Sequence, residues 1–368
     1  MERRTYLRSL AAGVFGLGGC LRTSGSDPTT TTEEAPFRIE TVTMELEVPW
    51  GVAFGPEDDL YVTERPGRVQ RITPEGTRDE PVADLTDTVA AQGEAGLLGL
   101  ALHPDDPGLA YTYQTYRGDR GLANRVVRHR VDDEFARESV VLDGVPGASV
   151  HDGGRIAFGP DGALYVTTGD ASNADLAQDR DSLAGKVLRL TPDGEPHPQN
   201  PFDNAVFSYG HRNPQGLAWR DGTLYVTEHG PDTDDEINVV RAGENYGWPE
   251  VRGSSGGEGS DDEEFTDPVA AYTPTVAPAS ATFYDGPVEE WRGDFFFGTL
   301  AGVHLHRVRI DDGEVVEQER LLDDKYSRLR TVFTGPDDHL YVTTSNRDGR
   351  GEDSAAPQDD RILRIQPA

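Results

Sequence analysis

The sequence predicts an all-β protein, a six-bladed β-propeller whose blades are built mostly of four antiparallel strands. Three observations lead to this prediction. One phrase recurs along the chain, the spacing of its copies fits six units, and no segment of the 368 residues has a strong amphipathic helical pattern. Sheets repeated at such a period indicate a propeller. A β-sandwich is the alternative, but a sandwich would not need a shared phrase.

The recurring phrase consists of a short apolar run, a turn of the Gly-Pro-acidic type or a shortened form of it, and then Leu-Tyr-Val-Thr. Its four copies place their tyrosines at Tyr61, Tyr165, Tyr225 and Tyr341. Each copy predicts a hairpin, because a tight turn separates an apolar strand from a β-branched and aromatic one. A third strand is predicted after three of the copies, at residues 68–72, 186–190 and 361–365.

The spacing of the copies gives the number of blades. Successive tyrosines of the phrase are 104, 60 and 116 residues apart, so each long gap has room for one divergent unit. Residues 97–102 with 110–113 fill the first gap, and residues 281–286 with 295–298 fill the second. The Gly, Ser and acid-rich run 253–268 is predicted to be a surface insertion.

The composition restricts the partners of the protein. The net charge is −32, and lysine occurs only at Lys186 and Lys325. Such a surface repels nucleic acid and anionic membranes, so neither is an expected partner. The charge is typical of a halophilic protein in molar salt, where the screening length falls to roughly 3 Å. A mesophilic, acidic, secreted protein is the alternative.

The first residues predict export rather than a folded element. Residues 1–20 contain Arg3-Arg4, which resembles a twin-arginine signal, and an apolar run at 10–17 that is too short to span a bilayer. The segment ends in a lipobox-like Leu-Gly-Gly-Cys at Cys20, the only cysteine. We therefore expect an exported, cell-surface protein that is lipid-anchored at Cys20 and reaches the membrane only through that anchor.

The remaining chain divides into a linker and one domain. Residues 21–36 have almost no apolar side chains to bury, which is typical of a flexible linker. Residues 37–368 are predicted to form the propeller. With Cys20 lipidated, this domain has no thiol catalysis, disulfide or cysteine metal site.

Two segments with unusual polar residues lie before predicted core strands. Residues 210–216 place Arg212 and Asn213 as donors next to a proline, in a loop that a rigid scaffold would hold. His151 stands beside a Gly-rich turn at the mouth of a strand. Imidazole exchanges protons near neutral pH, so His151 is a candidate general base, although a hydrogen-bonding turn histidine would look the same.

Acidic and basic candidates complete the set. The carboxylates and bent backbone of residues 228–238 and 245–249 suit a hard cation such as Ca²⁺, but could also be hydrated surface. Arg328 and Arg330 alternate onto one face of a strand, where two cations need an anion unless they are a surface pair. Glu94, placed between glycines, is a weak signal alone. The chain has no P-loop and no dinucleotide-binding glycine turn.

Taken in this order, the segments resemble the PQQ-dependent soluble aldose sugar dehydrogenases, the glucose/sorbosone dehydrogenase family. The resemblance covers essentially all of residues 40–368. It depends on phrases at residues 96–99, 151–155, 210–216, 234–238, 245–249, 274–278 and 344–351.

The resemblance implies a six-bladed propeller that holds PQQ and Ca²⁺ in its central cavity. By this likeness His151 is the general base that takes the proton of the sugar C1 hydroxyl while hydride passes to PQQ. Arg212 and Asn213 match residues that contact the quinone. Gly230 and Pro231 match carbonyl ligands of the Ca²⁺ bound to PQQ.

The resemblance assigns the other candidates as well. Glu236 and Tyr246 match a structural Ca²⁺ site, and Arg328 and Arg330 match arginines that hold the cofactor's carboxylates. An acidic chain needs such local cations to bind a tricarboxylate. Two positions depart from the pattern. Glu94, a cofactor-contacting position, is often glutamine in the family, and the lysine expected after Leu300 is replaced by Ala301.

The predicted function is therefore oxidation of the C1 hydroxyl of aldoses to lactones, with electrons passed on to an external acceptor. Two alternatives belong to other classes. A Ca²⁺-dependent propeller lactonase would use a Ca²⁺-bound water and would not need the paired arginines. A non-catalytic propeller would bind carbohydrate or protein, and the absent lysine favours it.

Overall fold

The computed structural model describes residues 36–76, 80–131, 135–254, 265–351 and 355–368. The predicted export signal, the predicted lipidation at Cys20 and nearly all of the predicted linker lie outside these ranges. The helices within them are single 3-10 turns, none of which could span a bilayer.

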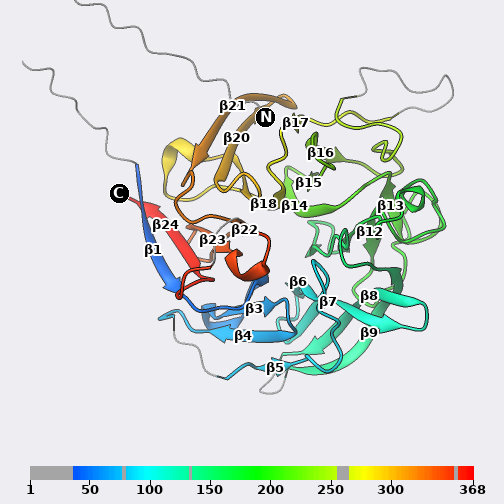
Figure 1. Ribbon diagram of the computed structural model, residues 1–368, viewed down its shortest axis with the longest axis horizontal. Helices are drawn as coiled ribbons and strands as arrows, with labels where there is room; N and C mark the ends of the chain where they lie inside the picture. Colours follow the sequence, from blue (N-terminus) through cyan, green and yellow to red (C-terminus); the bar gives the residue numbers. More distant parts are fainter. Residues whose placement is uncertain (1–35, 77–79, 132–134, 255–264, 352–354) are drawn as a thin grey trace, which may run out of the picture. The chain divides into compact units, whose positions relative to one another are not determined.

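Six four-stranded antiparallel sheets form a ring and confirm the predicted six-bladed propeller (Figure 1). Blades 1 to 3 consist of β2 (Pro49–Phe54), β3 (Leu60–Glu64), β4 (Arg68–Ile72) and β5 (Ala83–Asp84); β6 (Leu97–Leu102), β7 (Leu109–Gly118), β8 (Gly121–Arg130) and β9 (Ala136–Pro146); and β10 (Ile156–Phe158), β11 (Leu164–Thr168), β12 (Lys186–Leu190) and β13 (Val206–Tyr209).

Blades 4 to 6 follow in the same way. They consist of β14 (Pro214–Arg220), β15 (Thr223–Glu228), β16 (Asp235–Val240) and β17 (Ala270–Tyr272); β18 (Pro278–Phe283), β19 (Phe295–Thr299), β20 (Leu305–Asp311) and β21 (Glu314–Leu321); and β22 (Leu329–Thr334), β23 (Leu340–Thr344), β24 (Ile362–Pro367) and β1 (Phe37–Thr43). The 3-10 turns are η1 (Pro56–Asp58), η2 (Ala174–Ala177), η3 (Glu289–Trp291) and η4 (Asn346–Asp348).

The sixth blade closes the ring with both ends of the domain. β1 pairs antiparallel with β24, from Phe37 opposite Pro367 to Thr43 opposite Ile362. Its position as the outermost strand means that blade 6 is complete only when residues more than 300 positions apart have paired. The first strand of each blade lies innermost, where β2 contacts both β6 and β22.

The threonine of the recurring phrase ties neighbouring blades together. Thr63 donates its hydroxyl hydrogen to the carbonyl of Leu98 in the next blade, and Thr227 does the same to Ala279. The Thr63 hydroxyl also accepts the backbone N–H of Gly51 on the innermost strand at 2.7 Å. Equivalent threonines of two other blades accept N–H groups in or directly before their own innermost strands. The repeat therefore encodes blade contacts as well as hairpins.

The turn of the phrase has its own fixed contacts. In blade 3 the Tyr165 hydroxyl donates to Asp161 at 3.1 Å, and Arg189 from the third strand pairs with the same carboxylate. Gly159 has no room for a side chain, because a Cβ there would lie 2.6 Å from the Tyr165 ring. Blade 6 repeats the arrangement with Asp337 and Tyr341.

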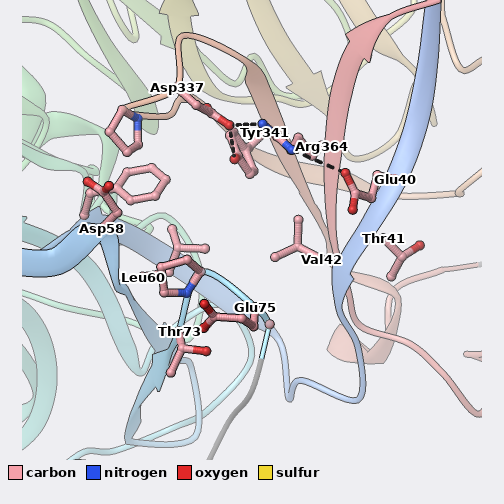
Figure 2. Close-up of a pocket in the computed structure, with 14 residues that line it drawn as sticks. Glu40, Thr41, Val42, Asp58, Leu60, Thr73, Glu75, Asp337, Tyr341 and Arg364 are labelled. Carbon is pink, nitrogen blue, oxygen red and sulfur yellow. Dashed lines mark hydrogen bonds and ion pairs between the residues drawn. The ribbon is translucent and has the colours of Figure 1, made fainter.

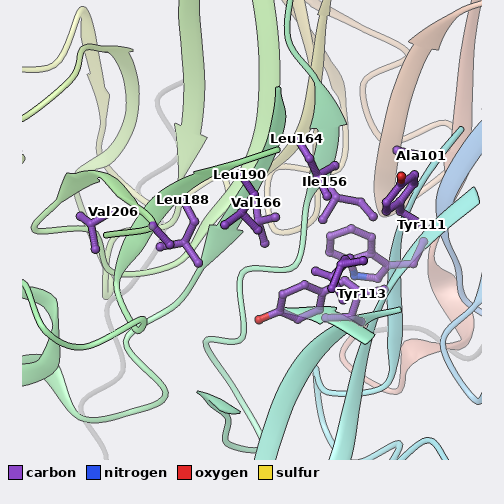
Figure 3. Packing of buried hydrophobic residues seen from close by; sticks show 14 residues of the cluster. Ala101, Tyr111, Tyr113, Ile156, Leu164, Val166, Leu188, Leu190 and Val206 are labelled. Atoms are coloured by element: carbon purple, nitrogen blue, oxygen red, sulfur yellow. The ribbon is translucent and has the colours of Figure 1, made fainter. Parts of the chain in front are cut away.

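The hydrophobic core is divided among the contacts between blades. One cluster combines Trp50 of blade 1, Tyr111 and Tyr113 of blade 2, and Leu164 and Leu188 of blade 3 (Figure 3). Because apolar side chains fill the spaces between sheets, the loops at the strand ends are left to carry polar groups.

Candidate active site

His151 lies between β9 and β10, in a turn that its positive φ of 63° makes tight. Its Nδ1 is 2.9 Å from a carboxylate oxygen of Asp170, and its backbone N–H donates to Glu94 at 3.0 Å. A carboxylate only accepts, so Nδ1 carries the hydrogen and Nε2 is left as the basic nitrogen of the neutral ring. The His151 side chain is 20% exposed, so the ring is not sealed inside the protein.

Asp170 follows Gly169, the first residue after β11, and is buried. Besides His151, its carboxylate accepts hydrogen bonds from Trp248 Nε1 at 2.9 Å and from the backbone N–H of Ser172 at 2.7 Å. These donors come from three separate segments. The carboxylate is therefore fixed in place, and it fixes the orientation of the imidazole.

Arg212 lies just before β14, over the ring of Trp248 at 5.3 Å. Its Nη1 donates to the carbonyls of Gly230 at 2.7 Å and His229 at 3.1 Å, while its backbone N–H bonds to Glu228. The Nε of Arg212 and the Nε2 of His229 are buried and have no hydrogen-bond partner among the described residues.

Asn213 brings the histidine turn and Glu94 together. Its Oδ1 accepts the backbone N–H of Gly153 at 3.0 Å, and its Nδ2 donates to Glu94 at 3.4 Å. Glu94, His151 and Asn213 therefore form one connected group, as the resemblance implied. Arg212 joins it through its carbonyl, which accepts the backbone N–H of Asp170 at 2.8 Å.

The Glu94 carboxylate pairs with Arg350 from the loop after η4. Burial alone raises the pKa of this carboxyl, but the neighbouring His229, Arg350 and the His151 N–H outweigh burial and lower the pKa below its ordinary value. Glu94 is thus a stable anion within a group of donors.

The paired arginines share a buried carboxylate. Arg328 donates to Asp348 at 2.7 Å and to the carbonyl of Leu300 at 2.9 Å, whereas Arg330 lies 3.7 Å from the same carboxylate. Arg330 also bonds to Gln215 at 3.2 Å. The anion that two such cations need is therefore supplied in part by the protein, and one carboxylate cannot neutralise two guanidinium groups.

The predicted calcium residues occupy the other side of Arg212. Glu236 and Glu228 lie directly opposite each other on β16 and β15. Burial and the nearby Glu228 raise the pKa of Glu236 to about 8. A cavity of about 20 Å³ is bounded by both carboxylates, Gly230, Pro231 and Tyr246. The Tyr246 ring stacks on His211, and its hydroxyl donates to the Val239 carbonyl at 2.7 Å.

Most of the predicted residues therefore lie at two neighbouring places, the group around His151 and Glu94 and the small cavity beside Glu236. Arg212 contacts both. The structure also adds residues that sequence reasoning missed: Asp170, Trp248, His229, Asp348, Arg350, and Arg65, whose Nη2 lies 3.5 Å from the Asp348 carbonyl. His229, Trp248, Asp348 and Arg350 lay inside segments already singled out. For Asp170 the available signal was a polar residue shortly after a Leu-Tyr-Val-Thr strand, and no local signal pointed to Arg65.

A separate cavity of about 370 Å³ lies where blade 6 meets blade 1 (Figure 2). Glu40 of β1, Asp58, Glu75 and Asp337 contribute acidic side chains, and Arg364 pairs with Glu40 and Asp337. None of the predicted site residues lines it, so it is not the candidate active site.

The propeller carries a His-Asp pair, and arginines are connected to that pair through Glu94 and through the Arg212 backbone. Comparison with known families identifies the class of protein that has these features. A family model described as Glucose / Sorbosone dehydrogenase matches residues 46–355. The chain belongs to this family.

Individual relatives agree with the family. Aldose sugar dehydrogenase YliI of Escherichia coli is 32% identical over 341 residues, which cover 86% of this chain and 92% of that protein. Quinoprotein glucose dehydrogenase B of Acinetobacter calcoaceticus is 35% identical over 254 residues, or 59% of this chain and 53% of that one. The solved PQQ-bound aldose sugar dehydrogenase of Streptomyces coelicolor is 40% identical, with a TM-score of 0.80 over 90% of this chain and 99% of that chain.

Proposed function

We propose that the protein is a PQQ-dependent dehydrogenase that oxidises the C1 hydroxyl of aldoses to lactones. The observation that carries the proposal is His151, whose Nδ1 is bound to the buried Asp170, placed beside a surplus of arginines in a chain of net charge −32. The family membership and the PQQ-bound relative support the same reaction class.

The donor set fits an anionic cofactor with several carboxylates. Arg328 and Arg330 share one carboxylate, and the buried Nε of Arg212 has no hydrogen-bond partner in the described part of the chain. Unmatched buried cations and an orphaned donor are costly unless a ligand offsets them. Arg328 and Arg330 would hold carboxylates of PQQ, and Arg212 and Asn213 would donate to its quinone. When bound, PQQ supplies the acceptor for the hydride of the sugar C1.

The chain's own residues supply the proton chemistry. His151 Nε2 takes the proton of the C1 hydroxyl as general base. Asp170 holds the ring in the tautomer that leaves Nε2 basic, and its negative charge stabilises the imidazolium that forms. Trp248 keeps Asp170 in place from one side and lies beneath Arg212 on the other. An external acceptor must then remove the electrons.

We propose Ca²⁺ at two places on the far side of Arg212. The carbonyls of Gly230 and Pro231 would bind one ion, and Glu236 with Tyr246 would contribute to the other. The described residues contain no cluster of three or more His, Cys, Asp or Glu side chains suited to a metal, so main-chain oxygens would provide much of the coordination. The facing carboxylates of Glu228 and Glu236 fit a cation, as does the buried Oδ1 of Asn238, which has no hydrogen-bond partner within the described ranges.

We also propose that the protein is exported by the twin-arginine route and anchored at Cys20, in a halophilic host. The Arg3-Arg4 pair, the lipobox-like sequence and the charge of −32 support this. Twin-arginine export moves folded proteins, which suits a ring that closes only when β1 pairs with β24.

The proposal is tested on the full chain purified in molar KCl, with PQQ and Ca²⁺ added. We expect dye reduction with at least one aldose, and loss of that activity in His151→Ala and Arg212→Ala. Lactone hydrolysis without PQQ would instead support a hydrolase. Tight sugar binding without turnover would support a non-catalytic propeller, and either result would overturn the dehydrogenase.

A further inference from the structure

Arg350 joins two blades that are far apart in the sequence. It lies in the loop after η4 in blade 6, and its guanidinium pairs with Glu94, on the loop that leads into β6, 256 residues away. Its backbone N–H donates to Asp348 at 2.9 Å, which anchors the loop. The Arg350 side chain is 40% exposed, and within the described ranges Glu94 is the one carboxylate paired with it.

Glu94 occupies donors of the kind that an anionic ligand needs. One of its oxygens accepts from the His151 N–H at 3.0 Å and from Asn213 Nδ2 at 3.4 Å, and the other binds Arg350. All three donors border the proposed cofactor site. A carboxylate of the protein therefore stands where a carboxylate-bearing ligand would bind.

The charges around this pair do not balance. Arg65 lies against the same group, with its Nη2 3.5 Å from the Asp348 carbonyl, and Glu94, Asp348, Arg328 and Arg350 are the charges that act on it. Arg330 is the fourth guanidinium here. Among the described residues of this group, two carboxylates thus face four guanidinium groups, so a further anion is favoured there on electrostatic grounds.

We propose that Arg350 is an additional cofactor-binding residue and that Glu94 is its ion-pair partner when no cofactor is bound. When PQQ binds, Arg350 exchanges the Glu94 carboxylate for a carboxylate of the cofactor. The inference depends on the proposed function. This exchange explains how the chain would bind PQQ, which carries three carboxylates, although Glu94 lies in the site and Ala301 stands where a lysine is expected.

The consequence is an opposite effect of the two side chains on cofactor affinity. Arg350→Gln removes a charge-assisted contact, so it weakens PQQ binding about 10- to 100-fold. Arg350→Lys keeps the charge and loses less. Glu94→Gln frees Arg350 from its competitor and tightens binding by about 3- to 10-fold, and the double variant loses this gain because Arg350 is no longer there to be freed.

The experiment titrates PQQ into the full chain without sugar or electron acceptor, and follows quenching of tryptophan fluorescence. Arg120→Gln is the matched control, since Arg120 is an exposed arginine without an ion pair among the described residues. Melting temperatures identify any variant that is misfolded, and the Arg350→Lys variant then carries the comparison.

The outcomes separate the inference from the proposed function. Wild-type affinity in Arg350→Gln overturns the inference alone. So does a Glu94→Gln variant that binds PQQ more weakly than the wild type, because Glu94 would then be a ligand and not a competitor. A wild-type chain that does not bind PQQ at all overturns both this inference and the proposed dehydrogenase.

Discussion

At the scale of single residues, the chemistry of the site depends on which nitrogen of His151 is free. Asp170 decides this, because its buried carboxylate receives Nδ1–H and is itself held by Trp248 and Ser172. A buried acceptor with three fixed donors has little freedom to reorient. The orientation of the His151 imidazole is therefore set by Asp170 and by the donors that hold Asp170 in place.

Asp170→Asn tests this role. The amide has nearly the same shape, but its NH₂ can donate to Nδ1, which places the ring hydrogen on Nε2 and removes the base. We expect kcat for aldose oxidation to fall about 100-fold or more, while KM changes little, because the contribution of a general base is of this size.

The matched control is Asp175→Asn, the same change at an exposed position in η2. Steady-state kinetics of the two variants and their melting temperatures separate a positioning effect from lost stability. Unchanged kcat in Asp170→Asn would show that Asp170 does not orient the base.

The residues that local phrases singled out are ones that the structure brings close together. Glu94, His151, Arg212 and Asn213 do come together, and each lies in a phrase with glycine or proline beside it. Residues whose role arises from contact across blades were missed. Arg350 meets Glu94 over 256 positions of sequence, and no local pattern records such a pairing.

At the scale of elements, the recurring phrase predicted the first two strands of four blades, and the two divergent blades were found from spacing. The fourth strands were not predicted. β13, β17 and β5 are short outer strands without a shared phrase, since an outer strand has a neighbour on one side only and its sequence is less restricted. The recurring phrase therefore identifies only the strands whose sequence is restricted by their neighbours.

The threonine of the phrase makes a prediction for the blades. In Thr227→Val the shape of the side chain is kept, but the hydrogen bond to the Ala279 carbonyl is lost and that buried oxygen is left without its donor. We expect the free energy of unfolding to fall by about 1–3 kcal/mol.

Thr223→Val is the control on the same strand, since the Thr223 side chain is partly exposed and has no hydrogen bond among the described residues. Urea unfolding compares the two variants. Equal stability of both would mean that the repeated threonine contributes nothing to the contact between blades.

At the scale of the whole molecule, ring closure and surface charge act against each other. The chain has 66 acidic and 34 basic residues, so the folded form concentrates like charges. Closure needs the first strand to pair with the last one, where Glu40 and Arg364 meet at the edge. That local pair is attractive, but the net charge of −32 makes the overall repulsion between carboxylates oppose the compact, closed ring.

Salt should consequently stabilise the protein. The screening length falls from about 10 Å at 0.1 M to about 3 Å at 1 M, which removes most repulsion between surface carboxylates. Salt also weakens surface ion pairs such as those of Arg309 with Glu317, but exposed pairs contribute only about 0–1 kcal/mol each. With nearly two acids for every base, the loss of repulsion outweighs the loss of pairs.

We expect the melting temperature to rise steadily with KCl, and to rise much less in sucrose of equal osmolality, because a neutral solute stabilises by exclusion without screening charge. A melting temperature that stays constant or falls with KCl would contradict the prediction, and with it the argument that the charge of −32 limits the stability of the closed ring.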